Sequence, residues 1–174
     1  MVKGFVIGFV LGVLGLMGFV YWYFGSGKAP VAVTDHNLPF ERTLAHRALD
    51  ARIDSVPAQT PPIPADEPNY LAGVEVYRAN CAVCHGLPNQ APTAISQGMY
   101  PKPPQLFRGK GVTDDPASET YWKATNGIRM TGMPGFRTAL SDTQLWQVSQ
   151  LLANADKIPD SVKKALAPDV TPAK

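Results

Sequence analysis

The residues from Gly4 to Phe24 form an apolar run that contains no charged side chain and lies between Lys3 and Lys28. Coiled as an α-helix, such a run spans roughly 30 Å, the thickness of the hydrocarbon core of a membrane. Its C-terminal end carries the aromatic residues that favour a membrane interface: Tyr21, Trp22 and Tyr23. We therefore expect residues 1–28 to form a single transmembrane anchor.

A cleaved signal peptide is the alternative interpretation of this run. The apolar region of a signal peptide usually has about 7–15 residues and ends at a cleavage site with small side chains. The run here is longer, and the best such site is Gly25-Ser26-Gly27, because Pro30 disfavours cleavage near Ala29. Lys3 favours a cytoplasmic N-terminus, although Lys28 on the other flank weakens that signal.

Glycines recur along the apolar run at Gly4, Gly8 and Gly12, which places them on one helical stripe. Small residues in such a stripe let two helices approach closely in lipid, so a partner transmembrane helix is one interpretation. The other is that glycine is simply frequent in membrane helices.

Residues 29–68 form a proline-rich tether in this interpretation. The chain has 17 prolines among 174 residues, well above the usual frequency of about 5%. A proline-rich stretch follows Val56 and acts as a semi-rigid, extended spacer. Its prolines are Pro57, Pro61, Pro62, Pro64 and Pro68. Before it, the pattern of residues 39–53 predicts one short helix with Phe40, Leu44 and Ala48 on its apolar side.

Residues 69–160 remain for one small domain, and residues 161–174 for a C-terminal tail. About a hundred residues bury only a modest core, so a domain of this size often needs a disulfide, a metal or a cofactor. Helical patterns cover residues 69–78, 117–126 and 141–155; Gly127 ends the second, and Ser141 opens the third with a capping box. The net charge of +2 gives no indication of a nucleic-acid partner.

The chain has only two cysteines, and both lie in the sequence Cys81-Ala82-Val83-Cys84-His85. This C-x-x-C-H pattern is typical of covalent haem c attachment. Two thiols on one helical turn can each add to a vinyl group of the same porphyrin, and the adjacent histidine then supplies the proximal nitrogen ligand of the iron. We therefore predict one haem c, bound by Cys81, Cys84 and His85.

Three other interpretations of the two cysteines exist. A thioredoxin-like dithiol needs a βαβ context, which the flanking sequence does not show. A structural zinc ion needs four ligands, and the remaining histidines, His36 and His46, lie in the tether. A simple surface disulfide is the third.

The sixth iron ligand has several candidates: Met99, Met130, Met133, His36 and His46. Among these, the residues around Met133 favour it, because Gly132 before it and Pro134 after it make a non-helical loop that can point a thioether inward, and the other candidates stay open at this point. A thioether raises the reduction potential and fills the sixth position, which favours electron transfer over catalysis.

From about Asn69 to Pro159 the sequence resembles the class I c-type cytochromes. The resemblance rests on Gly73, Tyr77, the C-x-x-C-H pattern, Asn126-Gly127, Gly132-Met133-Pro134 and Trp146. It implies an all-α fold around one covalent haem, with His85 and Met133 as axial ligands. It also implies that the first and last helices cross at Gly73, that Trp146 meets Tyr77, and that a proline carbonyl orients the proximal histidine; the sequence does not show which proline. Candidate partners of the haem propionates are Tyr100, Trp122 and Arg129.

We therefore expect an electron carrier, not an enzyme, on the periplasmic side of a cytoplasmic membrane. Its partner is a redox protein or a membrane respiratory complex, in which the chain is either a mobile head or a fixed subunit. A basic rim offers a docking surface for an acidic partner: Lys102, Arg108, Lys110, Lys123, Arg129 and Arg137. The alternative is a haem-based sensor or enzyme with an open sixth coordination site.

Overall fold

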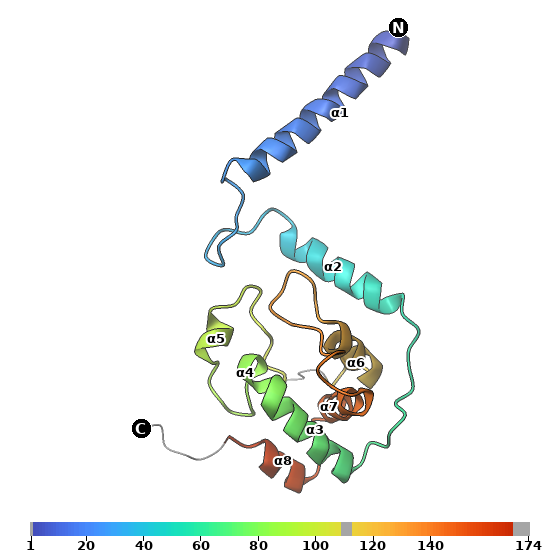
Figure 1. The fold of residues 1–174 in the computed structure, drawn as a ribbon, viewed down its shortest axis with the longest axis vertical. Coiled ribbons are helices and arrows are strands. Elements are labelled where there is room, and N and C mark those ends of the chain that lie inside the picture. Colours follow the sequence, from blue (N-terminus) through green and yellow to red (C-terminus); the bar gives the residue numbers. More distant parts are fainter. Residues whose placement is uncertain (1, 109–112, 169–174) are drawn as a thin grey trace. The chain divides into compact units, whose positions relative to one another are not determined.

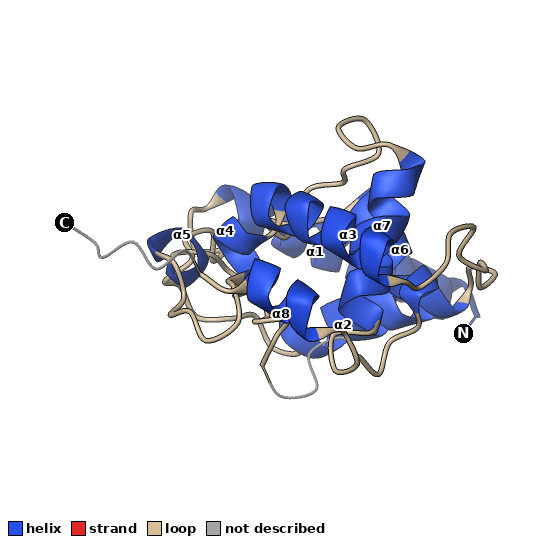
Figure 2. Ribbon diagram, turned by 90° about the horizontal axis from the view of Figure 1, so that it is seen from below, coloured by secondary structure: helices blue, strands red, loops and turns tan. Residues whose placement is uncertain are grey.

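The computed structural model describes residues 2–108 and 113–168, and all regular secondary structure in these ranges is helical (Figures 1 and 2). The internal contacts divide the chain into two compact units, residues 1–43 and 44–174. The helices are α1 (Val2–Gly25), α2 (Glu41–Asp54), α3 (Glu67–Asn80), α4 (Ala82–His85), α5 (Ala94–Gln97), α6 (Ala117–Asn126), α7 (Asp142–Ala153) and α8 (Asp160–Leu166). The prediction of an all-α fold is confirmed for the described residues.

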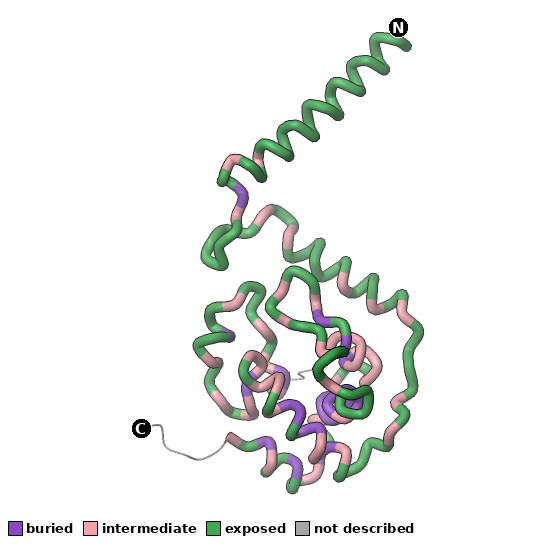
Figure 3. The backbone as a smooth tube through the Cα atoms, in the orientation of Figure 1, coloured by how far each residue is buried: buried purple, intermediate pink, exposed green. Residues whose placement is uncertain are grey.

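Helix α1 belongs to the first unit and covers the whole apolar run. Within the described residues it is the one helix long and apolar enough to cross a membrane, and it buries none of its side chains (Figure 3). Lys28 lies over the Trp22 ring, with its Nζ 4.9 Å from the ring centroid. This contact places a cation beside the aromatic end of the helix, as at a membrane interface.

Helix α2 matches the short helix predicted for residues 39–53. The Leu38 backbone N–H donates a hydrogen bond of 2.8 Å to the Glu41 carboxylate, which satisfies a free N–H group before the first turn. No side chain of α2 is buried, and Phe40 and Leu44 are exposed. The predicted apolar side therefore faces solvent in this structure.

The core of the second unit forms where α3 crosses α7. Asp66 caps α3 by accepting a hydrogen bond of 3.2 Å from the Asn69 backbone N–H. The helices touch at Gly73, where an added Cβ would lie 2.5 Å from the Gln147 carbonyl oxygen. Val74 and Leu151 beside this crossing are fully buried. The predicted crossing at Gly73 is confirmed.

Helix α6 packs on α7 and has the bounds predicted from the sequence. It ends at Gly127, whose φ of 67° favours glycine, and α7 opens with the predicted capping box between Ser141 and Gln144. Both helix boundaries are therefore set by local chemistry that is visible in the sequence.

The aromatic contacts differ from the implied meeting of Trp146 and Tyr77. Trp146 stacks on Tyr121 of α6, with ring centroids 4.1 Å apart. Tyr77 instead makes an edge contact with Phe107, at 5.0 Å between centroids. The approach of α6 to α7 brings Tyr121 to the tryptophan, and the loop after Pro104 brings Phe107 to the tyrosine.

The predicted tail at 161–174 is wrong for its first residues, because α8 packs against α3 (Figures 1 and 3). Val162 and Leu166 are buried and belong to the same core as Val74 and Leu151. Arg78 of α3 donates hydrogen bonds to carbonyl oxygens at the end of α8, at 3.2 Å to Ala165 and 2.8 Å to Ala167. The folded domain therefore continues beyond residue 160.

Candidate functional site

Cys81 caps the start of a single helical turn, α4, that directly follows α3, and Cys84 lies within that turn. The Cys81 N–H bonds the Tyr77 carbonyl oxygen at 2.8 Å, and the His85 N–H bonds the Cys81 carbonyl oxygen at 2.9 Å. Both cysteines have free, partly buried thiols. The turn thus carries the Cys84 thiol and the His85 imidazole, and the Cys81 thiol lies at its N-cap.

The imidazole of His85 is held by the carbonyl group of Pro104. Its Nδ1 lies 2.8 Å from the Pro104 oxygen. Burial lowers the pKa of His85, and the Pro104 hydrogen bond opposes this effect. In the neutral ring Nδ1–H donates to Pro104, so Nε2 keeps its lone pair for a metal. Among the prolines that the sequence left open, Pro104 orients this ring.

Three further side chains hold carbonyl groups of the same turn. The buried Tyr77 hydroxyl donates to the Gly86 oxygen at 2.6 Å, and the Thr93 hydroxyl donates to the Val83 oxygen at 2.6 Å. Gln105 adds a longer bond of 3.4 Å from its Nε2 to the Cys84 oxygen. Sequence reasoning missed Thr93 and Gln105, because only the path of the loop brings them to α4.

The environment of Cys81 argues against a redox-active dithiol. Burial, with a smaller effect of Cys84, raises the pKa of Cys81 to about 12. Reactive dithiol sites instead lower the pKa of their nucleophilic cysteine. The zinc interpretation also lacks support, because no group of three or more His, Cys, Asp or Glu side chains converges within residues 2–108 and 113–168.

Met133 lies in a tight loop that follows α6. The Ile128 N–H bonds the Met133 oxygen at 3.2 Å, and the Thr131 hydroxyl bridges the loop, donating to the Ile128 oxygen at 2.7 Å and accepting from the Met133 N–H at 3.1 Å. Met133 is partly buried, whereas Met130 is 93% exposed at a φ of 60°. The side chain of Met99 lies against Gly132 of this loop.

The donor set fits a covalently bound haem: two free thiols on one turn, and an imidazole with Nε2 left for iron. A family model described as cytochrome c oxidase, cbb3-type, subunit III matches residues 68–152. These residues form a c-type cytochrome domain. No curated protein and no solved structure matches the chain.

A c-type cytochrome transfers electrons through haem that is bound covalently to cysteine thiols. The matched range begins at Pro68, just before the predicted domain, and ends at Leu152 in α7. It contains the whole C-x-x-C-H turn and the Met133 loop. The cytochrome domain therefore coincides with the helices α3, α4, α5, α6 and α7, and α8 lies outside the match.

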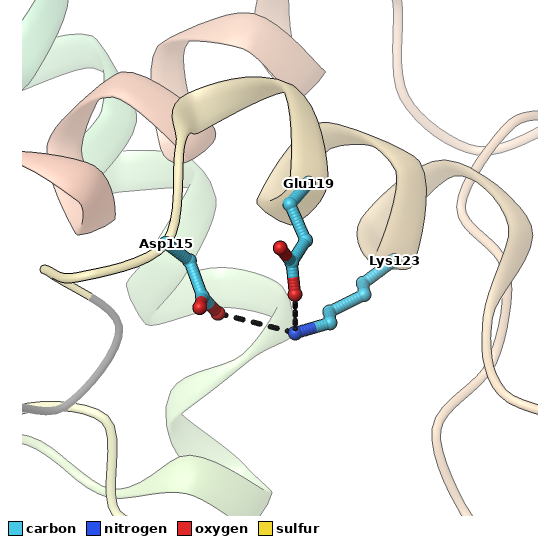
Figure 4. Close-up of polar contacts among 3 residues, drawn as sticks. All are labelled: Asp115, Glu119 and Lys123. Atoms are coloured by element: carbon cyan, nitrogen blue, oxygen red, sulfur yellow. Dashed lines mark hydrogen bonds and ion pairs between the residues drawn. The ribbon is translucent and has the colours of Figure 1, made fainter. Parts of the chain in front are cut away.

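Lys123, which the sequence placed in the basic rim, forms ion pairs inside the domain. Its Nζ lies 2.6 Å from Glu119 and 3.1 Å from Asp115, so its charge is neutralised within the domain (Figure 4). Arg108 and Arg137 are exposed, although each also donates a hydrogen bond, to Gln90 and Asn126 respectively. Lys110 lies outside the described residues.

The three predicted propionate partners lie at different depths. Trp122 on α6 is partly buried, Tyr100 is 40% exposed, and Arg129 is exposed at the start of the Met133 loop. Their role as propionate partners stays a prediction.

Proposed function

We propose that this protein carries single electrons between redox partners at a membrane, through one haem c bound by Cys81, Cys84, His85 and Met133. The observation that carries the proposal is the C-x-x-C-H turn with its imidazole fixed by Pro104, inside a c-type cytochrome domain. A bound haem would supply an iron that cycles between the ferric and ferrous states.

The residues around His85 prepare it for this role. Pro104 accepts the Nδ1–H bond, which fixes the tautomer and the ring orientation and makes Nε2 a stronger donor. Tyr77 and Thr93 hold the carbonyl groups of Gly86 and Val83, which lie close to His85 in the sequence. The ligand therefore needs little rearrangement when the iron changes charge.

Met133 completes the site in this proposal. Its loop is closed by hydrogen bonds of its own backbone and of the Thr131 hydroxyl. These bonds restrict the backbone that carries the thioether. A methionine ligand stabilises ferrous iron and leaves no open position for dioxygen or peroxide. Electron transfer is then favoured over oxygen chemistry.

We test the redox function by potentiometric titration of the purified full-length protein in detergent. We expect a single one-electron wave and rapid exchange with a soluble redox partner, with Cys81→Ala/Cys84→Ala as the variant that cannot attach haem. A redox-silent wild-type protein would refute the function. Carbon monoxide binding by the native reduced protein at neutral pH would favour the sensor or enzyme alternative.

The partner is, in this proposal, a membrane respiratory complex on the periplasmic side of the cytoplasmic membrane. The family description names an oxidase subunit, and α1 can keep the cytochrome domain close to such a complex. Co-purification of other redox subunits after mild detergent extraction would support a fixed subunit. A lone monomer would instead support a mobile carrier.

Docking of the partner should depend on the exposed cations Lys102, Arg108, Arg129 and Arg137. Exposed charges steer encounter, and salt screens them. We expect the rate of electron exchange to fall with ionic strength and to lose this dependence when the four residues are neutralised. A rate that salt does not change would refute electrostatic docking.

A further inference from the structure

One segment of the chain reaches residues on both sides of the proposed haem site. It runs from Met99 to Pro104, between α5 and Leu106. At one end the Pro104 carbonyl holds the Nδ1 of His85 at 2.8 Å. At the other end the Met99 side chain reaches the loop that carries Met133.

The contact of Met99 is made at Gly132, the residue directly before Met133. A Cβ added to Gly132 would overlap the Met99 Cε and would lie 3.6 Å from its Sδ. Glycine at position 132 therefore leaves the space that the methyl group of Met99 occupies. Met99 is partly buried, while its neighbour Tyr100 is 40% exposed, so the methionine is the residue of this pair that turns inward.

The Met133 loop, residues 128–135, is closed by its own hydrogen bonds, and backbone bonds hold its C-terminal side to α6. Ile128, Thr131 and Met133 bond one another. On the C-terminal side, the Phe136 N–H bonds the Ala124 oxygen of α6 at 2.9 Å. Met99 supplies a contact from a distant part of the sequence, at the residue next to the proposed ligand.

We propose that Met99 is a positioning residue for the sixth iron ligand: its side chain packs on Gly132 and keeps the Met133 thioether from yielding to other ligands. The proposal rests on the proposed function, in which Met133 binds iron. Met99 itself does not bind iron in this account. Its role depends on apolar volume, since a side chain that fills the space beside Gly132 restricts movement of the loop.

The test measures how easily an external ligand displaces Met133 in the purified ferric holoprotein. The variants are Met99→Ala, Met99→Val and Met99→Leu, with Met130→Ala as the matched control, because Met130 lies in the same loop and is 93% exposed. Two readouts are recorded for each: the far-red absorption band of the thioether–iron bond, and the dissociation constant of imidazole from optical titration.

We expect Met99→Ala to retain the far-red band but to bind imidazole about five- to tenfold more tightly than the wild type, because a looser loop yields its thioether more readily. The dissociation constant of imidazole for Met99→Val should lie between those for Met99→Ala and the wild type. Met99→Leu should restore nearly wild-type imidazole binding, since leucine fills a similar volume without sulfur. Met130→Ala should leave both readouts unchanged.

Three results would overturn the proposal. One is unchanged imidazole binding in Met99→Ala and Met99→Val. Another is a Met99→Leu variant that behaves like Met99→Ala, because sulfur and not volume would then matter. The third is loss of the far-red band in Met99→Ala while Met133→Ala keeps it, which would make Met99 the ligand. A wild-type protein without the band would instead refute Met133 ligation in the proposed function.

Discussion

The Tyr77 hydroxyl is the most deeply buried side-chain donor at the C-x-x-C-H turn. It bonds the Gly86 carbonyl oxygen at 2.6 Å, and the tyrosine has no exposed surface. Burial raises the pKa of Tyr77 above its usual value, so the hydroxyl keeps its proton and donates at every ordinary pH. The Gly86 carbonyl group therefore accepts from a donor that stays protonated.

Replacing Tyr77 by phenylalanine should leave the Gly86 carbonyl without its donor. We expect Tyr77→Phe to lower the free energy of unfolding by about 1–3 kcal/mol, the cost of an unsatisfied buried polar group. Urea unfolding of the holoprotein measures the loss, with Tyr100→Phe as the control on an exposed ring. Equal midpoints for Tyr77→Phe and the wild type would contradict the importance of this bond.

The ion pairs of Lys123 with Asp115 and Glu119 predict that the stability of the fold depends on pH. Burial alone would lower its pKa, but the ion pairs with Glu119 and Asp115 outweigh burial, so the pKa lies above the ordinary 10.5. The folded protein then holds this proton more tightly than the unfolded chain. Its contribution to stability is complete below pH 10.5 and is lost as the pH rises through the folded pKa.

Lys123→Met should therefore be less stable than the wild type at pH 7, and the difference should shrink above pH 10.5. Urea midpoints at neutral and strongly alkaline pH check this. Lys163→Met is the matched control, because Lys163 pairs with Asp160 at an exposed site. A difference between Lys123→Met and the wild type that stays constant with pH would contradict the ion-pair account.

At the level of helices, Gly73 fixes how closely α3 and α7 approach. In an unconstrained helix, alanine is more favourable than glycine by about 1 kcal/mol. Here the added Cβ would lie 2.5 Å from the backbone oxygen of Gln147, so we expect Gly73→Ala to destabilise the domain by about 1–3 kcal/mol. A more stable Gly73→Ala variant would show that helix propensity dominates, and a less stable one would show that the packing of α3 on α7 dominates.

The matched control is Gly98→Ala, because an added Cβ there meets its nearest neighbours at 3.5 Å, an ordinary contact. Thermal unfolding of both holoproteins makes the comparison. If Gly73→Ala were as stable as Gly98→Ala or the wild type, the crossing would be looser than the structure indicates.

The predicted helices include those with clear boundary signals in the sequence, whereas the short helices α5 and α8 were not predicted. The α6 end at Gly127 and the capping box of α7 are local chemistry, so both were found. Helix α8 is short, follows Pro159, and has no side-chain cap; it owes its burial to α3 and its end to Arg78. Val162 and Leu166 are four positions apart, as on a helix, but a helix of 7 residues is too short for this spacing to stand out in the sequence.

At the candidate site, too, local sequence patterns could be predicted and contacts between distant residues could not. C-x-x-C-H is a local pattern, and so is the Met133 loop between glycine and proline, so both can be predicted from the sequence. The choice of Pro104 for His85 and the contact of Met99 with Gly132 join residues that are distant in the sequence. Loop paths decide these contacts, and residue spacing does not encode them.

At the scale of the whole molecule, α1 and the cytochrome domain predict a protein that is held at a membrane. Helix α1 remains exposed along its length, which suits lipid and not water. We expect the full-length protein to stay in the membrane fraction after an alkaline carbonate wash, and a chain starting at residue 29 to be released. A mature N-terminus after residue 25 would instead identify a cleaved signal peptide.

We propose a haem c that is attached to Cys81 and Cys84 and ligated by His85 and Met133. The most direct test is the visible absorption spectrum of the purified full-length protein, first oxidised and then reduced. We predict sharp low-spin c-type bands, with the far-red thioether–iron band present in the oxidised protein and absent from Met133→Ala. A high-spin spectrum, low-spin bands without the far-red band, or a protein without haem would contradict the account.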